Sequence, residues 1–169
     1  MNVSHEILQR RAAALLEICR DAGLSIATAE SCTGGLIASY LTSVSGSSDV
    51  VDRGFVTYTN ESKSEMLGVP ADLIAANGAV SEVVANAMAE GALARSRAHI
   101  AVAVTGIAGP TGGTKKKSVG TVHLAACRNG KVLSRKENFE GDREAVRMKT
   151  VAVAFELVEE LSGFRVRRK

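Results

Sequence analysis

Hydrophobic residues recur at helical spacing in the first part of the chain. Between Ser4 and Ala22 they fall on one face of a helix, at Ile7, Leu8, Ala12, Leu15, Leu16 and Cys19. Ser4 is suited to cap the N-terminus, and Gly23 is suited to end the helix. The pattern therefore predicts an amphipathic helix as the first element.

Short apolar and β-branched runs predict five strands, at residues 24–29, 50–59, 99–104, 119–127 and 131–138. The run at 99–104 is continuously apolar, which is typical of a strand covered on both faces. Asn129-Gly130 separates the last two runs and predicts a hairpin turn. The sheet is expected to end in this hairpin.

The remaining periodic segments predict helices, which cover residues 36–41, 60–67, 71–75, 81–97 and 142–161. Asn60 and Asp142 are expected to be N-caps, and Gly68 is expected to end the second of these helices. Alternating helices and strands indicate an α/β fold, a three-layer α/β/α sandwich with a mixed, mostly parallel sheet of about five strands. We expect one domain over 1–169, with 162–169 as a basic tail, and ligands at the strand ends.

Composition narrows the class of protein. The 169 residues are 46% hydrophobic and 23% charged, which is typical of a globular chain. Apolar runs stay shorter than the roughly 18 residues of a membrane span, and the N-terminus lacks a secretory signal. Three cysteines without a CxxC pair or a zinc-like spacing argue against disulfides and a metal site. We expect a soluble, cytoplasmic protein that needs no metal or cofactor.

Charge argues against nucleic acid as a partner. The chain has 21 basic and 18 acidic residues, but four of the basic ones, Arg165, Arg167, Arg168 and Lys169, cluster at the C-terminus. Without them the balance is 17 minus 18, or −1. With no Trp and 4% aromatics, the rest of the chain lacks the basic face and stacking rings of a nucleic-acid binder. The tail is either solvated or a weak contact for an anionic partner.

Ser31 is a candidate nucleophile. It lies in a polar, glycine-bearing segment, TAESCTGG, between a predicted strand and a predicted helix, where backbone N–H groups favour a developing anion. The segment resembles a nucleophile elbow only loosely, since it is not GxSxG. The alternative is that Ser31 or Thr33 merely caps the helix while the glycines allow a tight turn.

Lys63 is the better of the candidate bases. The three histidines, His5, His99 and His123, lie on an exposed helix, at the start of a strand and in an apolar strand, where a satisfied core imidazole is expected. Lys63 lies at the start of a helix, where the helix N-terminus and burial would both disfavour its ammonium form. The alternative is an ordinary solvated lysine.

Two further segments are suited to bind an anion. The loop at 106–113 carries several glycines whose backbone N–H groups can approach a phosphate or an oxyanion, although it is neither GxGxxG nor a Walker loop. Arg143 and Arg147 lie one helical turn apart, which suits phosphate, but ordinary surface arginines are the alternative. Lys115, Lys116 and Lys117 are most simply a solvated loop.

Six segments, in order over nearly the whole chain, resemble the CinA C-terminal domain family of competence/damage-inducible proteins. They are 28–35 (TAESCTGG), 54–63 (GFVTYTNESK), 78–81 (GAVS), 105–113 (TGIAGPTGG), 119–122 (VGTV) and 141–147 (GDREAVR). One departure is Ser118, where family members usually have proline. Many relatives carry an additional N-terminal domain, which we do not expect here.

The resemblance implies a nicotinamide-nucleotide amidohydrolase that converts nicotinamide mononucleotide to nicotinate mononucleotide and ammonia in pyridine-nucleotide recycling. It implies a Ser/Lys pair, with Ser31 as nucleophile, Lys63 as general base and Tyr58 as a helper in the proton network. The residues expected to bind substrate are Thr33, Gly34, Gly35, Thr105, Gly106, Gly109, Gly112, Gly113, Arg143 and Arg147. The N–H groups of 33–35 or of the glycine loop would hold the oxyanion.

Three alternatives accompany this interpretation. The domain would bind a nucleotide without turning it over, in competence or the response to DNA damage, or it would bind nucleic acid through its lysines and arginines. Cys32 would replace Ser31 as the nucleophile if its thiol were activated at a helix N-terminus. We expect a small-molecule nucleotide substrate, no membrane partner and a homo-oligomer.

Overall fold

The computed structural model describes residues 3–163, which form six helices, one 3-10 helix and five strands. In chain order these are α1 (His5–Asp21), β1 (Ile26–Glu30), α2 (Leu36–Thr42), η1 (Ser47–Asp49), β2 (Val51–Val56), α3 (Asn60–Leu67), α4 (Ala71–Asn77), α5 (Glu82–Ala94), β3 (Ile100–Gly106), β4 (Thr121–Arg128), β5 (Lys131–Asn138) and α6 (Arg143–Ser162). The predicted order of elements is confirmed. The four clustered basic residues of the predicted tail lie outside the described part of the chain.

The five strands form one mixed sheet in the order β2-β1-β3-β4-β5. β1 pairs in parallel with both β2 and β3, whereas β4 is antiparallel to β3 and to β5. Four strands therefore run in one direction and only β4 runs against them. The carboxyl ends of β1, β2 and β3 meet at one edge of the sheet, where ligands of α/β folds collect.

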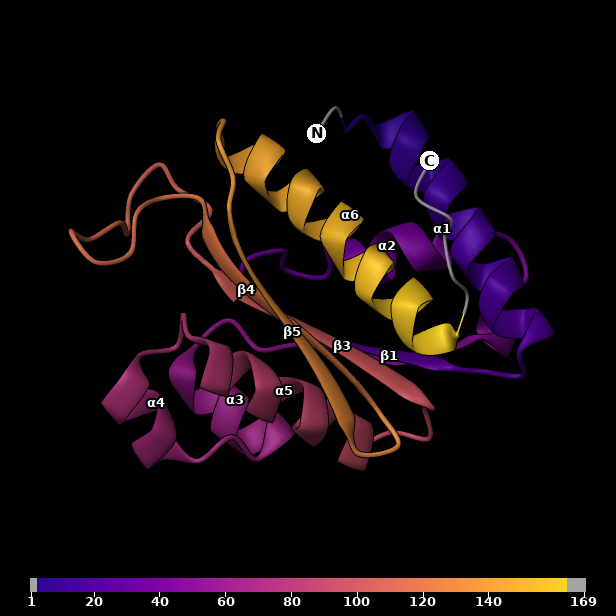
Figure 1. Ribbon diagram of the computed structural model, residues 1–169, viewed down its shortest axis with the longest axis horizontal. Helices are drawn as coiled ribbons and strands as arrows, with labels where there is room; N and C mark the ends of the chain where they lie inside the picture. The colour runs from indigo at the N-terminus through magenta and orange to yellow at the C-terminus, as the bar shows by residue number, and fades with distance from the viewer. Residues whose placement is uncertain (1–2, 164–169) are drawn as a thin grey trace.

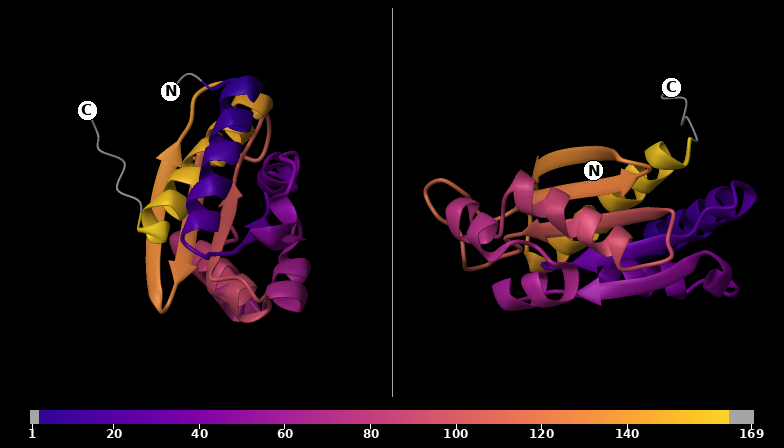
Figure 2. Two further views of the ribbon diagram at one scale, coloured as in Figure 1. Left: turned by 90° about the vertical axis from the view of Figure 1, so that its right-hand side faces the viewer. Right: turned by 90° about the horizontal axis from the view of Figure 1, so that it is seen from below.

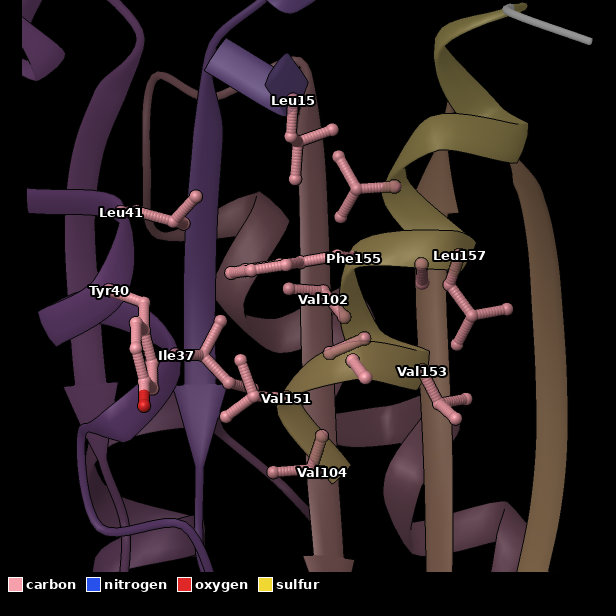
Figure 3. Close-up of a cluster of buried hydrophobic side chains, with 14 of the residues drawn as sticks. Leu15, Ile37, Tyr40, Leu41, Val102, Val104, Val151, Val153, Phe155 and Leu157 are labelled. Atoms are coloured by element: carbon pink, nitrogen blue, oxygen red, sulfur yellow. The ribbon is translucent and has the colours of Figure 1, made fainter. Parts of the chain in front are cut away.

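Helices cover both faces of the sheet, so the predicted three-layer sandwich is confirmed (Figure 1). One apolar core lies between the sheet and α1, α2 and α6, and Figure 3 shows Phe155 and Val151 of α6 packing beside Val102 and Val104 of β3 and Ile37 of α2. A second core lies between the sheet and α3, α4 and α5. The segment between β3 and β4 projects beyond the sheet (Figures 1 and 2).

Several boundaries differ from the predicted ones. α3 is capped by Thr59 and not by Asn60, because the Thr59 side chain accepts from the Ser62 N–H while the Ser62 hydroxyl accepts from the Thr59 N–H. β3 extends to Gly106, since its pairing with β4 continues to Val122. α5 ends at Ala94 and not at residue 97. Ser4 and Asp142 cap α1 and α6 as predicted.

Within residues 3–163, no helix is long and apolar enough to cross a membrane.

Candidate active site

Ser31 lies directly after β1, at the first position of a tight turn that leads into α2. Its backbone N–H donates to the Val104 carbonyl at 3.0 Å, and its own carbonyl accepts from the Gly34 N–H at 3.0 Å. These two bonds tie the residue to β3 on one side and to the turn on the other. The Ser31 side chain is therefore held at the carboxyl edge of the sheet, where it lines a pocket.

Lys63 comes from α3 and is buried, with only 1% of its surface exposed. Its Nζ lies 3.1 Å from Ser31 Oγ and donates to the Thr57 carbonyl at 2.7 Å and the Thr59 carbonyl at 3.4 Å. The alternative of a solvated helical lysine is therefore wrong. No acidic side chain in the described part of the chain forms a salt bridge with Lys63.

Burial has opposite effects on the pKa values of Lys63 and Cys32. It lowers the pKa of Lys63, because an ammonium ion loses its hydration. Burial raises the pKa of Cys32 to about 12, because a thiolate would lose its hydration. A neutral amine next to a serine hydroxyl suits proton abstraction, whereas a protonated thiol is a poor nucleophile.

Glu30 lies at the end of β1 and its side chain is fully buried beneath the first turn of α2. Its Oε2 accepts from the Thr33 hydroxyl at 2.6 Å and from the N–H groups of Gly35 at 3.2 Å and Ile37 at 2.9 Å. Its Oε1 accepts from the Ala38 N–H at 2.9 Å. The amide groups at the start of α2 are thus used within the protein, and they do not offer an anion site.

A pocket of about 260 Å³ opens beside Ser31 and Lys63. It is lined from five parts of the chain that are distant in the sequence: Ser31 and Cys32; Tyr58, Asn60 and Lys63; Ala79 and Val80; Thr105, Gly106, Ile107, Ala108, Gly109, Thr111 and Gly112; and Arg143. The three glycine-bearing or polar segments that follow strands therefore meet at one site, as the sequence predicts.

The glycine loop after β3 forms a further part of the pocket wall. Gly109 has φ +83°, and a Cβ atom there would lie 2.5 Å from Val119 Cγ1. A Cβ atom at Gly106 would lie 2.7 Å from Val122 Cγ2. Only glycine fits these two positions, because the loop passes close to the start of β4. The Thr105 hydroxyl donates to the Ala79 carbonyl at 3.0 Å and joins the loop to the segment before α5.

The two candidate arginines lie in different places. Arg143 lines the pocket, and its guanidinium donates to the Gly109 carbonyl and the Tyr58 hydroxyl, both at 2.7 Å. Arg147 donates to the Thr33 carbonyl at 2.8 Å and does not line the pocket. The geometry therefore favours Arg143 as the residue that meets an anionic ligand.

The structure brings Ser31, Lys63, Tyr58, Thr105, Gly106, Gly109, Gly112 and Arg143 to the pocket, whereas Thr33, Gly34, Gly35, Gly113 and Arg147 do not line it. The Tyr58 side chain is 58% exposed, and its hydroxyl bonds to Arg143 and not to the Ser31–Lys63 pair. Sequence reasoning missed Asn60, Ala79 and Val80, although the GAVS segment was a recognisable signal for the last two. It also assigned no role to Glu30, whose position just before a helix was a signal for capping.

His123 differs from the satisfied core histidine that the sequence predicts. It is 9% exposed and faces the α5 layer, but its Nδ1 has no hydrogen-bond partner in the described structure. Burial lowers its pKa, as do Lys136 and Lys117. Lys117 itself donates to the Asn77 carbonyl at 2.9 Å, whereas Lys115 and Lys116 are exposed, as the sequence predicts. Residues 3–163 contain no group of His, Cys, Asp and Glu side chains arranged to hold a metal ion.

The sequence of this chain is similar to those of several known proteins. A sequence model of the CinA C-terminal domain matches residues 8–162. Nicotinamide-nucleotide amidohydrolase PncC of Escherichia coli is 50% identical over 135 residues, which cover 79% of this chain and 82% of that protein. A CinA-like protein of Citrifermentans bemidjiense is 52% identical over 139 residues, but this match covers only 34% of that longer protein.

Solved structures agree with these sequence matches. The crystal structure of a competence/damage inducible protein from Agrobacterium tumefaciens has a TM-score of 0.91 and 49% sequence identity, and the match covers 95% of this chain and 99% of that one. A structure of the CinA superfamily from Escherichia coli has a TM-score of 0.86 at 34% identity. The chain belongs to the CinA C-terminal domain family.

Proposed function

We propose that the protein hydrolyses the carboxamide of nicotinamide mononucleotide to nicotinate mononucleotide and ammonia, in pyridine-nucleotide recycling. The observation that carries the proposal is the 3.1 Å approach of Lys63 Nζ to Ser31 Oγ inside a pocket, with Lys63 buried. The 50% identity to a nicotinamide-nucleotide amidohydrolase supports this choice of substrate.

Ser31 is the nucleophile and Lys63 its base in this mechanism. In the neutral amine, the two N–H groups donate to the carbonyls of Thr57 and Thr59, which leaves the lone pair to accept the Ser31 proton. As Ser31 Oγ bonds to the amide carbon, this proton moves to Lys63. The amide C–N bond then breaks as Lys63 returns the proton to the nitrogen. Ammonia departs, and the acyl group remains as an ester of Ser31.

Water completes the cycle by the same route. Lys63 takes a proton from a water molecule as its oxygen bonds to the acyl carbon. The bond from that carbon to Ser31 Oγ breaks, and Lys63 gives the proton back to the serine. The products are the pyridine acid and the free enzyme, and serine and lysine provide both the nucleophile and the base.

The glycine loop is the better source of oxyanion donors. The N–H groups of Gly34 and Gly35 already donate to the Ser31 carbonyl and the Glu30 carboxylate. Ala108 and Gly109 line the pocket, and within residues 3–163 their N–H groups donate to no protein acceptor. Arg143 at the same wall supplies the positive charge for the substrate phosphate.

Ammonia release from nicotinamide mononucleotide, measured for the wild type and for Ser31→Ala without added metal, tests this proposal. Loss of the nucleophile is expected to lower kcat by about 10³-fold or more. Equal rates in the two proteins would exclude Ser31 as the nucleophile. If the folded wild type released no ammonia but its Tm rose on adding the nucleotide, the result would instead favour a domain that binds the nucleotide without catalysis.

We further propose that the chain is a cytoplasmic homo-oligomer. Its cysteines Cys19, Cys32 and Cys127 are free and buried, as suits a reducing compartment. Four large apolar side chains are exposed on the described surface, namely Val56, Tyr58, Met66 and Val83. Light scattering measures the mass in solution, and a monomer at all concentrations would contradict the oligomer.

A further inference from the structure

The side chain of Glu30 lies outside the pocket and outside the Ser/Lys mechanism, yet it is joined to the turn that carries Ser31. We propose that Glu30 is a positioning residue, which holds Ser31 in the orientation that reacts by fixing the turn 31–35 onto α2. This inference rests on the proposed amide hydrolysis, because it assigns Glu30 a role in that reaction.

The surroundings of Glu30 fit a fixed, charged anchor. The side chain is fully buried, and its two oxygens receive four hydrogen bonds, from Thr33, Gly35, Ile37 and Ala38. Four donors match the lone pairs of an ionised carboxylate. No Lys or Arg of the described chain forms a salt bridge with it, so these four donors are the groups that compensate its burial.

The bonds of Glu30 fix the end of the Ser31 turn. The turn begins at Ser31, whose N–H is held by Val104 of β3, and it closes through the bond from the Gly34 N–H to the Ser31 carbonyl. Beyond that closure, Thr33 and Gly35 are held by the Glu30 carboxylate. Without it, the turn would keep the bond to Val104, its own closure and the bond from Arg147 to the Thr33 carbonyl, but it would lose all four bonds that join it to the Glu30 carboxylate and so to the end of β1.

Glu30 is also joined to the base. Its backbone carbonyl accepts from the Thr57 N–H at 2.9 Å, and the Thr57 carbonyl accepts from Lys63 Nζ at 2.7 Å. The main chain of Glu30 is therefore connected to the strand end that receives Lys63, while its side chain is connected to the turn that carries Ser31. A rotation of this residue would change the distance between the two reacting groups.

The position of Glu30 predicts which kinetic constant depends on it. Neither Glu30 nor Thr33 lines the pocket, so their loss leaves the substrate contacts in place. The alignment of Ser31 with Lys63 is needed for the chemical step, and small errors in alignment are costly. We therefore expect changes in this network to lower kcat while KM stays the same.

Thr33→Val tests this with little risk to the fold, because valine has the shape of threonine and the three backbone bonds to Glu30 remain. Losing the 2.6 Å hydroxyl bond to a carboxylate is expected to lower kcat by about 10-fold, with KM unchanged. Thr33→Ser keeps the hydroxyl and is expected to restore most of the rate. Thr42→Val, which removes an exposed hydroxyl from the other end of α2, is the matched control and is expected to leave kcat unchanged.

A second readout does not depend on the amide substrate. The rate at which an organic fluorophosphonate modifies Ser31, followed by mass spectrometry, reports the reactivity of the nucleophile. It is expected to fall in Thr33→Val and further in Glu30→Gln, with both variants checked for folding by circular dichroism.

The outcomes separate the two proposals. Wild-type kcat and wild-type Ser31 labelling in folded Thr33→Val and Glu30→Gln would overturn the role of Glu30, even if the wild type hydrolyses the amide. A rise in KM at unchanged kcat would also overturn it, because that would show a binding role. An inactive wild type whose labelling still depends on Glu30 would instead overturn the proposed reaction.

Discussion

The turn at 30–38 and the glycine loop at 105–113 both contribute residues to the lining of the pocket, but they use most of their backbone amides differently. In the turn, the N–H groups of Gly34, Gly35, Ile37 and Ala38 all donate to neighbouring protein oxygens. In the loop, Ala108 and Gly109 line the pocket with N–H groups that donate to no acceptor of residues 3–163.

This difference indicates a division of labour, in which the turn orients Ser31 and the loop contacts the substrate. Most amides of the turn are paired, although those of Cys32 and Thr33 donate to no backbone carbonyl of residues 3–163. Paired amides make a segment rigid and suited to orient a side chain, whereas open amides are suited to bind a ligand. Changes on the turn side should therefore lower kcat through the orientation of Ser31, and changes to the loop amides should lower kcat through the oxyanion, whereas loss of the Arg143 charge should raise KM.

Lys63→Met should have the largest effect, because it removes the base while an unbranched apolar side chain fills most of the buried space. We expect kcat to fall by about 10³-fold, within the usual range for general base catalysis. The measurement is steady-state ammonia release. Lys149→Met, at a lysine that donates to the Glu140 carbonyl on the surface, is the control and should behave like the wild type. A KM effect without a kcat effect would contradict the division.

The pH dependence of the reaction also tests the role of Lys63 as the base. Because burial lowers its pKa, kcat/KM should rise with pH and level off below the usual lysine value of 10.5. Between the lowered pKa and 10.5 the unfolded chain binds one more proton at this residue than the folded chain, so the free energy of unfolding should also rise with pH in that window. Denaturant unfolding of Lys63→Met should lack this contribution. If the free energy of unfolding changed with pH equally in both proteins, Lys63 would not be the source of the pH dependence.

Arg143→Ala should have the next largest effect, on KM. Loss of a charge-assisted contact to a phosphate is expected to raise KM by about 10- to 100-fold with a smaller change in kcat. Arg147→Ala is the comparison, because this residue donates to the Thr33 carbonyl and lies outside the pocket. Initial-rate kinetics give KM for both variants. A larger KM for Arg147→Ala than for Arg143→Ala would show that Arg147, and not Arg143, binds the phosphate.

Gly109→Ala should lower kcat by about 5- to 10-fold, because a Cβ atom 2.5 Å from Val119 Cγ1 must shift the loop and the oxyanion donors that it carries. Gly130→Ala is a matched control, since Gly130 also has a positive φ, of +77°, but a Cβ atom there would meet nothing within 4 Å. Both variants should lose about 1–2 kcal/mol of stability from backbone strain. Equal kcat values in the two variants would argue that the loop amides do not hold the oxyanion.

Cys32→Ser should have the smallest effect, with kcat and KM within about 2-fold of the wild type. The thiol is buried, its pKa is raised to about 12, and it is therefore protonated near neutral pH. Mass spectrometry after treatment with iodoacetamide should find the residue unmodified in the folded protein. A large loss of kcat would return Cys32 to consideration as the nucleophile.

The elements of the fold could be predicted because their signals are local. Ser4 and Asp142 cap helices as predicted, and the hairpin at Asn129-Gly130 follows from its turn residues. The cap of α3 was misplaced by one residue, because Thr59 and Asn60 are both good caps and only the partner hydroxyl of Ser62 decides between them. The end of β3 depends on its pairing with β4, which no local pattern shows.

The site was less predictable, because burial is a property of the assembled fold. Spacing alone did not separate Lys63 from a solvated lysine, and the resemblance to a family pointed to its role. The same limit applies to Arg143 and Arg147, which lie on one helix but have different partners. Glu30 escaped notice because its four donors come from residues three to eight positions later, in a turn whose shape is not encoded by its spacing.

The bond from the Ser31 N–H to Val104 has a consequence for the order in which the protein is made. Ser31 and Lys63 leave the ribosome early, but β1 becomes a central strand only when β3 has been synthesised and inserted beside it. Arg143 emerges later still. A translation product that stops before β3 would contain both members of the pair without the strand that orients Ser31, so the organised site appears only when most of the chain has been synthesised.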